Sequence, residues 1–322
     1  MQLPESLQFA IKEQAATVEL KKLRQAAEDL STRYRLTQNT PQQFIMTAPH
    51  SIAYITTRLP ATFAAVTAVL REVKARVPNY PIRSLLDLGA GPGTAAWAAQ
   101  QIFPDLQRVT MVERDQKLMQ IGQQMASHSR EVALRTAEWR GEDLQTCGAF
   151  PPHDLVIASY SLGELLPEWR DDLLRKAWEA ASKAIVLVEP GTTKSFALLR
   201  EIRASFLEQG GQLIAPCPHH AECPLSKSDW CHFAARVERT ALHRKLKEGL
   251  LSFEDEKYSY LAIAKGSVTR ATARVLRRPN IKTGFVAIKI CTPQGETDLT
   301  VTRSQKEQFK RARKINWGDA WE

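Results

Sequence analysis

The amino-acid sequence predicts an α/β fold in which a parallel sheet is covered by helices on both faces. Short apolar runs alternate with helical stretches from Ile82 onward, and the first run leads into a glycine-rich turn. An acidic residue, Glu113, closes the second run. Strict alternation of strands and helices is typical of parallel sheets, and a glycine turn after the first strand is typical of those that bind nucleotides. We therefore expect a Rossmann-like core over residues 81–210.

The composition is that of a globular protein with a sizeable core. The chain has 322 residues, of which 43% are hydrophobic and 25% charged. Its first residues, MQLPESLQFAIKEQ, contain early acids and no apolar stretch, so they predict neither a secretory signal nor a transit peptide. No apolar run approaches the roughly 18 residues of a membrane span. We therefore expect a cytoplasmic protein with no membrane partner, in which clustered cysteines are metal ligands rather than disulfides.

Residues 1–80 form a predicted N-terminal helical region. Apolar residues recur at helical spacing over residues 4–35 and again over residues 45–77. Pro49 and Pro60 interrupt the second stretch, because proline removes a backbone donor.

Residues 81–210 form the predicted core, whose strands are short apolar runs bounded by turns. Five strands are expected over residues 84–90, 108–114, 132–139, 153–160 and 183–191. Four helices are expected over residues 95–103, 116–128, 168–181 and 194–209.

Two further regions follow the core. Residues 211–256 form a cysteine-rich insertion that ends in a helix-like stretch over residues 234–250. Residues 257–322 contain strand-like runs, which we expect to complete the sheet, and a basic tail that begins as a helix. The strand-like runs cover residues 257–265, 271–278, 284–292 and 298–304.

The glycine turn is DLGAGPGT, residues 87–94. Gly89, Gly91 and Gly93 let the backbone turn sharply and approach a ligand closely. Asp87 precedes them and can orient the turn or meet an ammonium group. The G-x-G-x-G pattern resembles motif I of class I S-adenosylmethionine-dependent methyltransferases, in which this turn binds the cofactor.

Two acids follow the turn in the chain. Glu113 lies 20 residues after Gly93, at the end of the second strand, where a carboxylate can accept both hydroxyls of a ribose. Asp143 follows the third strand, where the methyltransferase family usually contacts adenine. The alternative is that both are surface acids. No catalytic residue is predicted. The fourth strand ends in ASYSLGEL, which contains no cysteine that could act as a nucleophile, and we interpret Cys147, which precedes this strand, as structural.

Three of the five cysteines lie within residues 217–233. Cys217, Cys223 and Cys231 leave a tetrahedral site one ligand short, and Cys291 could fold back to complete it. Three interpretations remain open for these cysteines: buried free thiols, a structural zinc site and an iron–sulfur cluster. The zinc site could take its fourth ligand from a nearby histidine, namely His219, His220 or His232.

Positive charge is concentrated near the C-terminus. The chain has a net charge of +9, and residues 265–314 contain thirteen Lys and Arg against three acids. This predicts either a solvated basic face or a surface that binds the phosphates of RNA or DNA. Membrane attachment fits less well, because the segment has the alternation of strands and no long amphipathic helix.

Several stretches of the chain resemble the Rsm-twenty-two (Rsm22) family of methyltransferase-like proteins of the small ribosomal subunit. They are YITTRLPATFAAV (54–66), LLDLGAGPGTAAWAA (85–99), YSLGEL (160–165), LVEPGT (187–192), APCPHHAECPL (215–225), DWCHF (229–233), EDEKYSYL (254–261) and WGD (317–319). The cysteine–proline–histidine stretch is the specific one, because many methyltransferases share the glycine turn.

The resemblance implies a class I methyltransferase fold with an S-adenosylmethionine pocket at the glycine turn. It also implies a 4Fe–4S cluster on Cys217, Cys223, Cys231 and Cys291, and association with small-subunit ribosomal RNA during ribosome assembly. Two functions follow as hypotheses. The chain is either an rRNA methyltransferase or an assembly factor that binds rRNA without methylating it.

Overall fold

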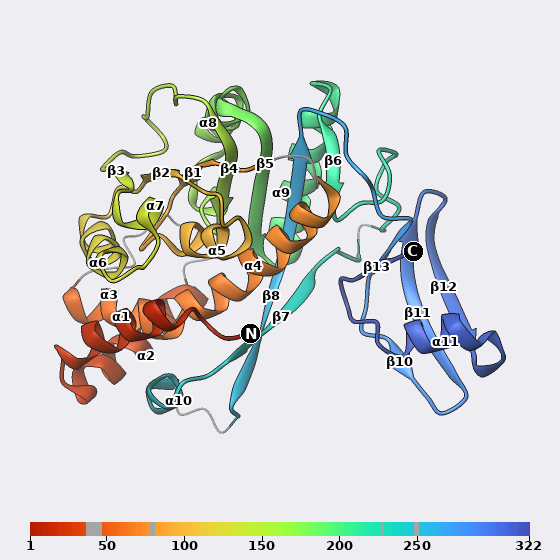
Figure 1. Ribbon diagram of the computed structural model, residues 1–322, viewed down its shortest axis with the longest axis horizontal. Coiled ribbons are helices and arrows are strands. Elements are labelled where there is room, and N and C mark those ends of the chain that lie inside the picture. Colours follow the sequence, from red (N-terminus) through yellow and green to blue (C-terminus); the bar gives the residue numbers. More distant parts are fainter. Residues whose placement is uncertain (37–46, 78–80, 227, 248–250) are drawn as a thin grey trace. The chain divides into compact units, whose positions relative to one another are not determined.

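The computed structural model describes residues 1–36, 47–77, 81–226, 228–247 and 251–322. The chain forms two compact units (Figure 1). Unit 1 comprises Met1–Arg71, Tyr80–Val188 and Ala235–Glu256, and unit 2 comprises Glu72–Asn79, Glu189–Ala234 and Lys257–Glu322. The four regions predicted from the sequence remain a prediction, since each unit draws on several of them.

The sheet of unit 1 is parallel, with strand order β3-β2-β1-β4-β5. Its strands are β1 (Ser84–Leu88), β2 (Arg108–Val112), β3 (Glu138–Arg140), β4 (His153–Ser159) and β5 (Ala181–Pro190). The inner strands are buried almost without interruption, as expected for a sheet covered on both faces. This order is that of doubly wound sheets, and it confirms the predicted α/β fold of the class I methyltransferase kind.

Helices cover this sheet, and further helices precede it in the chain. Between consecutive strands, the chain forms α5 (Thr94–Ile102), α6 (Gln116–Ser127) and α8 (Pro167–Ala180). The N-terminal helices are α1 (Glu5–Ala16), α2 (Leu20–Leu36), α3 (Ala48–Thr57) and α4 (Leu59–Arg76). In unit 1, α1 packs on α3 and α6, while α2 packs on α3 and α10 (Ala241–Lys247) (Figure 1). Residues 45 and 46 of the second predicted helical stretch lie outside the described part of the chain.

Two elements differ from the prediction. Residues 132–139 are not one strand. The short helix α7 (Val132–Arg135) comes first, and β3 is the part of this stretch that pairs with β2. Residues 234–250 are not one helix either, because β7 (Phe233–Glu238) precedes α10, and residues 248–250 lie outside the described part. The sequence of β7, FAARVE, has helix-forming residues, but its side chains alternate between buried and exposed. The segment is therefore a strand because its alternating side chains can be buried on one face, and this outweighs the intrinsic helix propensity of its residues.

Unit 2 contains α9 (Thr193–Glu208) and two sets of strands. In the first set, β6 (Gln212–Ala215) pairs antiparallel with β8 (Phe253–Ala264). The second set is a sheet of order β10-β11-β9-β13, in which β12 also pairs with β11. Its elements are β9 (Ala273–Val275), β10 (Asn280–Ile281), β11 (Phe285–Thr292), β12 (Gly295–Thr302) and β13 (Ala320–Trp321).

Of the late strands, β9 to β13 do not complete the first sheet as predicted, because they form a sheet with its own core, whereas the first predicted run, β8, belongs to the eight-stranded sheet that contains β1 to β5. Val286, Ile288 and Ile290 of β11 are buried on one face, against Phe309 and Ala312 of helix α11 (Lys306–Ala312). This one-sided burial is typical of an antiparallel sheet covered by a single helix.

Among the described residues, no single helix is long and apolar enough to cross a membrane. Within the same residues, the pair α3 and α4 has the length and composition of a span only when the two are taken together, and they are bent by 45° relative to each other.

Candidate functional site

A cavity of about 280 Å³ lies in unit 1 at the carboxyl ends of β1 and β4. This is the edge at which doubly wound sheets bind ligands. Of the residues predicted from the sequence, Gly89, Gly91, Glu113 and Asp143 line it. Asp87 and Gly93 lie close in the chain but do not line the cavity.

The glycine turn has a backbone that other residues adopt only with strain. Gly89, Gly91 and Gly93 have φ values of 71°, 55° and 83°, which lie in the left-handed region that glycine occupies without steric cost. A side chain at Gly89 would also overlap its neighbour, because an added Cβ would lie 2.5 Å from Cβ of Ser161. The turn therefore requires glycine for conformation throughout and for space at its first position.

Glu113 ties the second strand to this turn. Its Oε2 accepts a hydrogen bond from the backbone N–H of Gly91 at 2.7 Å, and its Oε1 accepts one from Asp115 at 2.8 Å. Burial raises the pKa of the Glu113 carboxyl, and these backbone bonds counteract part of that shift. Each oxygen keeps a second lone pair, so the carboxylate can still accept a pair of hydroxyls from a ligand.

Asp87 lies below the turn and is fully buried. Neither of its carboxyl oxygens has a hydrogen-bond partner among the described residues. Burial and the neighbouring Glu113 raise the pKa of Asp87 to about 7. The predicted contact with an ammonium group stays a prediction, because Asp87 does not line the cavity.

Asp143 lies at the rim of the cavity, and protein groups already engage both of its oxygens. Its Oδ2 is 3.1 Å from Nη1 of Arg114, and its Oδ1 accepts from the backbone N–H of Gln145 at 2.9 Å. The side chain is 36% exposed, so it can move toward a ligand.

The opposite wall of the cavity was not predicted from the sequence. It includes Tyr54 and Arg58 of α3 and the α3–α4 corner, together with Tyr160 at the end of β4. The Tyr160 hydroxyl donates to Oε1 of Glu256 at 3.1 Å, and Nη2 of Arg58 lies 3.5 Å from the same oxygen. Tyr160 has a φ of 58°, a strained value for a side chain of this size, and such strain is concentrated at functional sites.

Unit 2 contains a second, smaller cavity of about 50 Å³. Cys217, Cys223, Cys231 and Cys291 all line it. The first three come from the segment between β6 and β7, and the fourth comes from β11. The fold therefore brings Cys291 to the earlier three. Cys147 is buried elsewhere, in unit 1, where its thiol donates to the Leu144 carbonyl at 3.4 Å.

The thiols of this cavity influence one another. Burial, reinforced by the other cysteines, raises the pKa of Cys231 well above its usual value. Burial raises the pKa of Cys291 to about 12, and Cys217 and Cys223 add to the shift. Burial also raises the pKa of Cys217, so without a cation nearby the thiols of Cys217, Cys231 and Cys291 stay protonated at neutral pH.

Of the three histidines considered as alternative ligands, only His219 lines the cavity. Its Nε2 lies 3.5 Å from the sulfur of Cys291. The ring of His220 accepts from the backbone N–H of Leu213 at 3.3 Å, and the ring of His232 stacks on Trp230 with centroids 4.7 Å apart. Within the described residues, no group of three or more His, Cys, Asp and Glu side chains is arranged to hold a metal ion. The ligand assignment stays a prediction.

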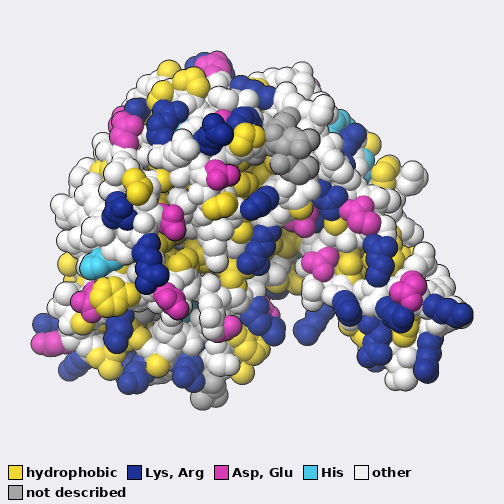
Figure 2. Space-filling model, in the orientation of Figure 1, with side chains coloured by type: hydrophobic (Ala, Val, Ile, Leu, Met, Phe, Trp, Pro, Cys, Tyr) yellow, Lys and Arg dark blue, Asp and Glu magenta, His cyan; other side chains and the backbone are white. Residues whose placement is uncertain are grey.

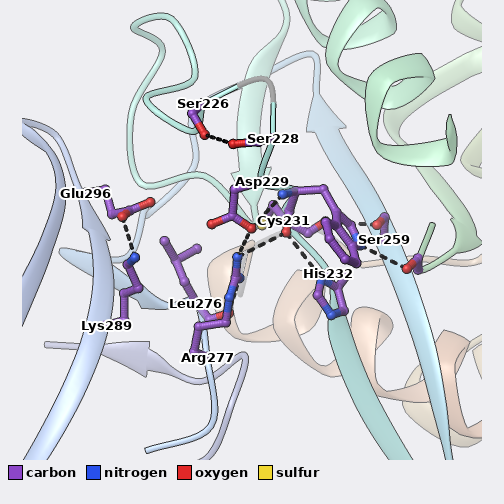
Figure 3. A network of polar contacts seen from close by, with 12 residues as sticks. Ser226, Ser228, Asp229, Cys231, His232, Ser259, Leu276, Arg277, Lys289 and Glu296 are labelled. Atoms are coloured by element: carbon purple, nitrogen blue, oxygen red, sulfur yellow. Dashed lines mark hydrogen bonds and ion pairs between the residues drawn. The ribbon is translucent and has the colours of Figure 1, made fainter. Parts of the chain in front are cut away.

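A polar network holds the segment around Cys231 in place (Figure 3). Asp229 forms an ion pair with Arg277, and its Oδ1 accepts from the backbone N–H of Trp230 at 2.8 Å. Ser259 donates to the carbonyl of Cys231 at 2.8 Å. These bonds fix the backbone of the third cysteine between β8 and the loop that follows β9.

The predicted basic surface lies in unit 2. Figure 2 shows Lys and Arg side chains gathered around α11 and the adjoining end of β12. On and after α11, Lys306, Lys310, Arg311, Arg313 and Lys314 are all exposed, and Glu307 is the acid among them. The charge is thus placed for contact with a polyanion, while a solvated face remains the alternative.

Comparison with known proteins identifies the family. The sequence model described as "Mitochondrial small ribosomal subunit Rsm22" matches residues 48–322. The chain belongs to the Rsm22 family. This confirms the resemblance derived from the glycine turn and the cysteine segment, and the matched range includes the whole lining of the cysteine cavity and most of that of the cavity in unit 1.

Two relatives of known name are similar to this protein over most of its chain. The human protein "Ribosome assembly protein METTL17, mitochondrial" is 28% identical over 303 residues, covering 86% of this chain and 64% of its own length. "Rsm22-cox11 tandem protein 2, mitochondrial" of Schizosaccharomyces pombe is 27% identical over 361 residues, covering 91% of this chain and 46% of its own length. The chain thus spans about half to two thirds of the length of these relatives.

The predicted cytoplasmic location is wrong. The family description and both relatives are mitochondrial by name, which points to the mitochondrion. The prediction rested on the composition of the first residues, and that composition alone does not decide where a protein is delivered.

Solved methyltransferases resemble the chain only distantly. Magnesium protoporphyrin IX methyltransferase from Synechocystis, with bound SAM, has a TM-score of 0.42 and 14% identity, over 73% of this chain and 91% of that one. A putative RNA methyltransferase from Pyrococcus horikoshii has a TM-score of 0.41 and 12% identity, over 75% and 96%. The fold assignment given above rests on the strand order, not on these two structures.

Proposed function

We propose that this Rsm22 protein binds S-adenosylmethionine in the cavity of unit 1 and acts on small-subunit ribosomal RNA during ribosome assembly. The observation that carries the cofactor proposal is the bond between Glu113 and the N–H of Gly91, inside a cavity of about 280 Å³. This size is near the lower end of ligand pockets, which begin at about 300 Å³. The relatives' names, which refer to ribosome assembly and to the small subunit, support the partner.

Each part of the cavity has a role in this proposal. Glu113 would accept the ribose hydroxyls, while the backbone from Gly89 to Gly91 would face the methionine part. Asp143 would lie near the adenine. The bound cofactor supplies an electrophilic methyl group on a sulfonium, and its transfer can depend mainly on positioning. Arg58 and Tyr160 would then orient the acceptor, and no general base is assigned.

Calorimetry with S-adenosylmethionine tests the pocket. Binding by the unmodified protein, weakened at least tenfold in Glu113→Ala, would support it, because two hydrogen bonds of about 1 kcal/mol each are lost. Asp105→Ala is the matched control, since this exposed acid does not line the cavity. Absence of binding to the unmodified protein would count against the pocket.

A second candidate function is an assembly factor that binds rRNA without methylating it. The human relative is named as an assembly protein, which favours this alternative. The two functions are separated by mapping rRNA methylation with and without the gene. An unchanged map alongside defective small subunits would favour the assembly factor.

The 4Fe–4S cluster is part of the same proposal. The four cysteines line one cavity, and burial together with the neighbouring cysteines raises the pKa of Cys231, so a bound cation would stabilise the thiolates that hold it. Cys217, Cys223, Cys231 and Cys291 would be the ligands, with zinc as the alternative metal. Anaerobically purified protein should contain iron and sulfide and absorb broadly in the visible range. One zinc per chain without iron would favour the structural zinc site.

A further inference from the structure

The cysteine cavity contains two buried guanidinium groups that the proposed function leaves unexplained. Arg274 is 1% exposed and Arg203 is 7% exposed, and both line the cavity. Arg274 forms an ion pair with Glu72 at 2.7 Å. Arg203 donates to the carbonyls of His219 and Ala221, at 3.0 and 2.7 Å, and no carboxylate pairs with it in the described part of the chain. Buried charges usually have a partner of opposite sign, so one is missing here.

The position of Arg274 follows from strand register. Arg274 of β9 is the cross-strand neighbour of Cys291 in β11, so both side chains leave the same face of the sheet. The Nε of Arg274 donates to the carbonyl of Pro216 at 3.0 Å, and its Nη1 donates to Gly318 and Glu72 at 2.9 and 2.7 Å. These bonds account for three of the five N–H groups of a guanidinium.

The remaining nitrogen, Nη2 of Arg274, is buried and has no partner within the described residues. The cavity that it borders is lined by sulfurs. Arg203 and Arg274 are both buried beside these sulfurs, so they favour a negatively charged occupant of the cavity.

We propose that Arg274 is the counter-ion of a metal–thiolate centre in this cavity, with its Nη2 donating to a cysteine sulfur and Arg203 supplying a second positive charge. The inference rests on the proposed function for the presence of the metal. Four thiolates carry more negative charge than one zinc ion or an oxidised 4Fe–4S core neutralises. The centre is then anionic in either case, and buried cations are its natural partners. Arg274 is a positioning residue, because it holds the sulfur and not the metal.

The test compares four variants and one control variant with the unmodified protein, all purified anaerobically. Arg274→Gln removes the charge, Arg274→Lys keeps it without the planar fork, and Arg203→Gln removes the second charge. Glu72→Gln removes the ion-pair partner and keeps the guanidinium. Arg278→Gln, at an exposed arginine outside the cavity, serves as the matched control. Iron, sulfide and zinc are measured for each, followed by the rate at which a chelator removes the metal.

Arg274→Gln should release metal about 10- to 100-fold faster, the usual effect of losing a partner of a metal ligand. Arg203→Gln should also release it faster, and Arg274→Lys should be intermediate. Glu72→Gln should lower the melting temperature while keeping the unmodified release rate, which separates a counter-ion from a purely structural arginine. If iron is bound, Arg274→Gln should also lower the reduction potential, because a positive charge stabilises the more negative reduced centre.

The possible outcomes separate a failure of the counter-ion role from a failure of the proposed metal centre. Unmodified protein without iron or zinc would overturn both. Unmodified protein with metal, together with unchanged release from Arg274→Gln and Arg203→Gln, would overturn the counter-ion alone. If Arg274→Gln does not fold, Arg203→Gln and Arg274→Lys decide. Faster release from both supports the proposal, and unmodified rates in both refute it.

Discussion

Replacing Gly89 by alanine should destabilise the protein more than the same replacement elsewhere in the turn. Gly89 has a φ of 71°, and an added Cβ would lie 2.5 Å from Cβ and 3.1 Å from Oγ of Ser161. Ser161 is itself held in place, because its hydroxyl donates to the carbonyl of Leu88 at 3.0 Å. The substitution therefore combines backbone strain with an overlap that no rotamer change of Ser161 relieves, because its Cβ is fixed by the backbone.

The two contributions can be separated with matched glycines. A left-handed backbone costs an L-residue about 1–2 kcal/mol, and overpacking costs about 1–3 kcal/mol more. Gly91→Ala and Gly210→Ala place a Cβ where nothing lies within 4 Å, at φ values of 55° and 81°, so they carry the strain alone. We expect a loss of about 2–5 kcal/mol for Gly89→Ala and about 1–2 kcal/mol for each of the other two.

Urea unfolding followed by circular dichroism measures these losses. Gly89→Ala should unfold at the lowest urea concentration, with Gly91→Ala and Gly210→Ala close to each other. Calorimetry adds a second comparison, because Gly91 lines the cavity and Gly210 does not. Gly91→Ala should weaken S-adenosylmethionine binding, and Gly210→Ala should leave it unchanged. The reasoning fails if Gly89→Ala and Gly91→Ala unfold at the same urea concentration.

Three further predictions follow from the site. The pKa of Asp87 rises from 3.8 to about 7 on folding, so its stabilising contribution is complete below pH 4 and is lost as the pH rises through 7. Asp87→Asn should remove this part of the pH dependence of urea unfolding, and an unchanged profile would contradict it. Cys291→Ser should lose iron that Cys147→Ser retains, as measured by iron and sulfide analysis, and equal iron in both would reject Cys291 as a ligand. Lys310→Ala and Lys314→Ala should each reduce the salt dependence of rRNA binding by about one unit of slope, whereas full retention of the slope would place the RNA elsewhere.

The core strands could be predicted because their pattern is local. β1, β2, β4 and β5 each contain a short, mainly apolar run, and parallel strands buried on both faces need such runs. The edge strand β3 has three residues and exposes its first side chain, so it lacks this pattern. The apolar residues just before it, Ala133 and Leu134, are buried by the short helix α7 instead.

The second sheet could not be predicted in the same way. A strand's sequence reports which of its faces is buried but not which sheet supplies the cover. The alternation of Val286, Ile288 and Ile290 fits an added edge of the first sheet as well as a separate sheet. Only the packing of Phe309 against these residues, from a helix that follows in the chain, decides between them.

The two halves of the cavity in unit 1 differ in the same respect. Gly89, Gly91 and Glu113 follow consecutive strands, whose carboxyl ends meet at one edge of a parallel sheet, so their proximity follows from chain order. Tyr54 and Arg58 reach the cavity through the packing of the N-terminal helices. No spacing rule connects a corner of α3 with the end of β4. That these residues line one cavity is therefore known only from the structure.

This difference bears on catalysis. The half of the cavity that would hold the cofactor consists of backbone and the carboxylates of Glu113 and Asp143, and Glu113 is also needed to hold the glycine turn. Its geometry therefore persists whether or not methyl transfer occurs. The half formed by Arg58 and Tyr160 is held by side-chain contacts to Glu256, and Tyr160 has a strained φ of 58°. If the Tyr160 hydroxyl orients an acceptor, Tyr160→Phe should leave cofactor binding intact and reduce only cross-linking of rRNA at the cavity, which makes this wall the place to look for a substrate.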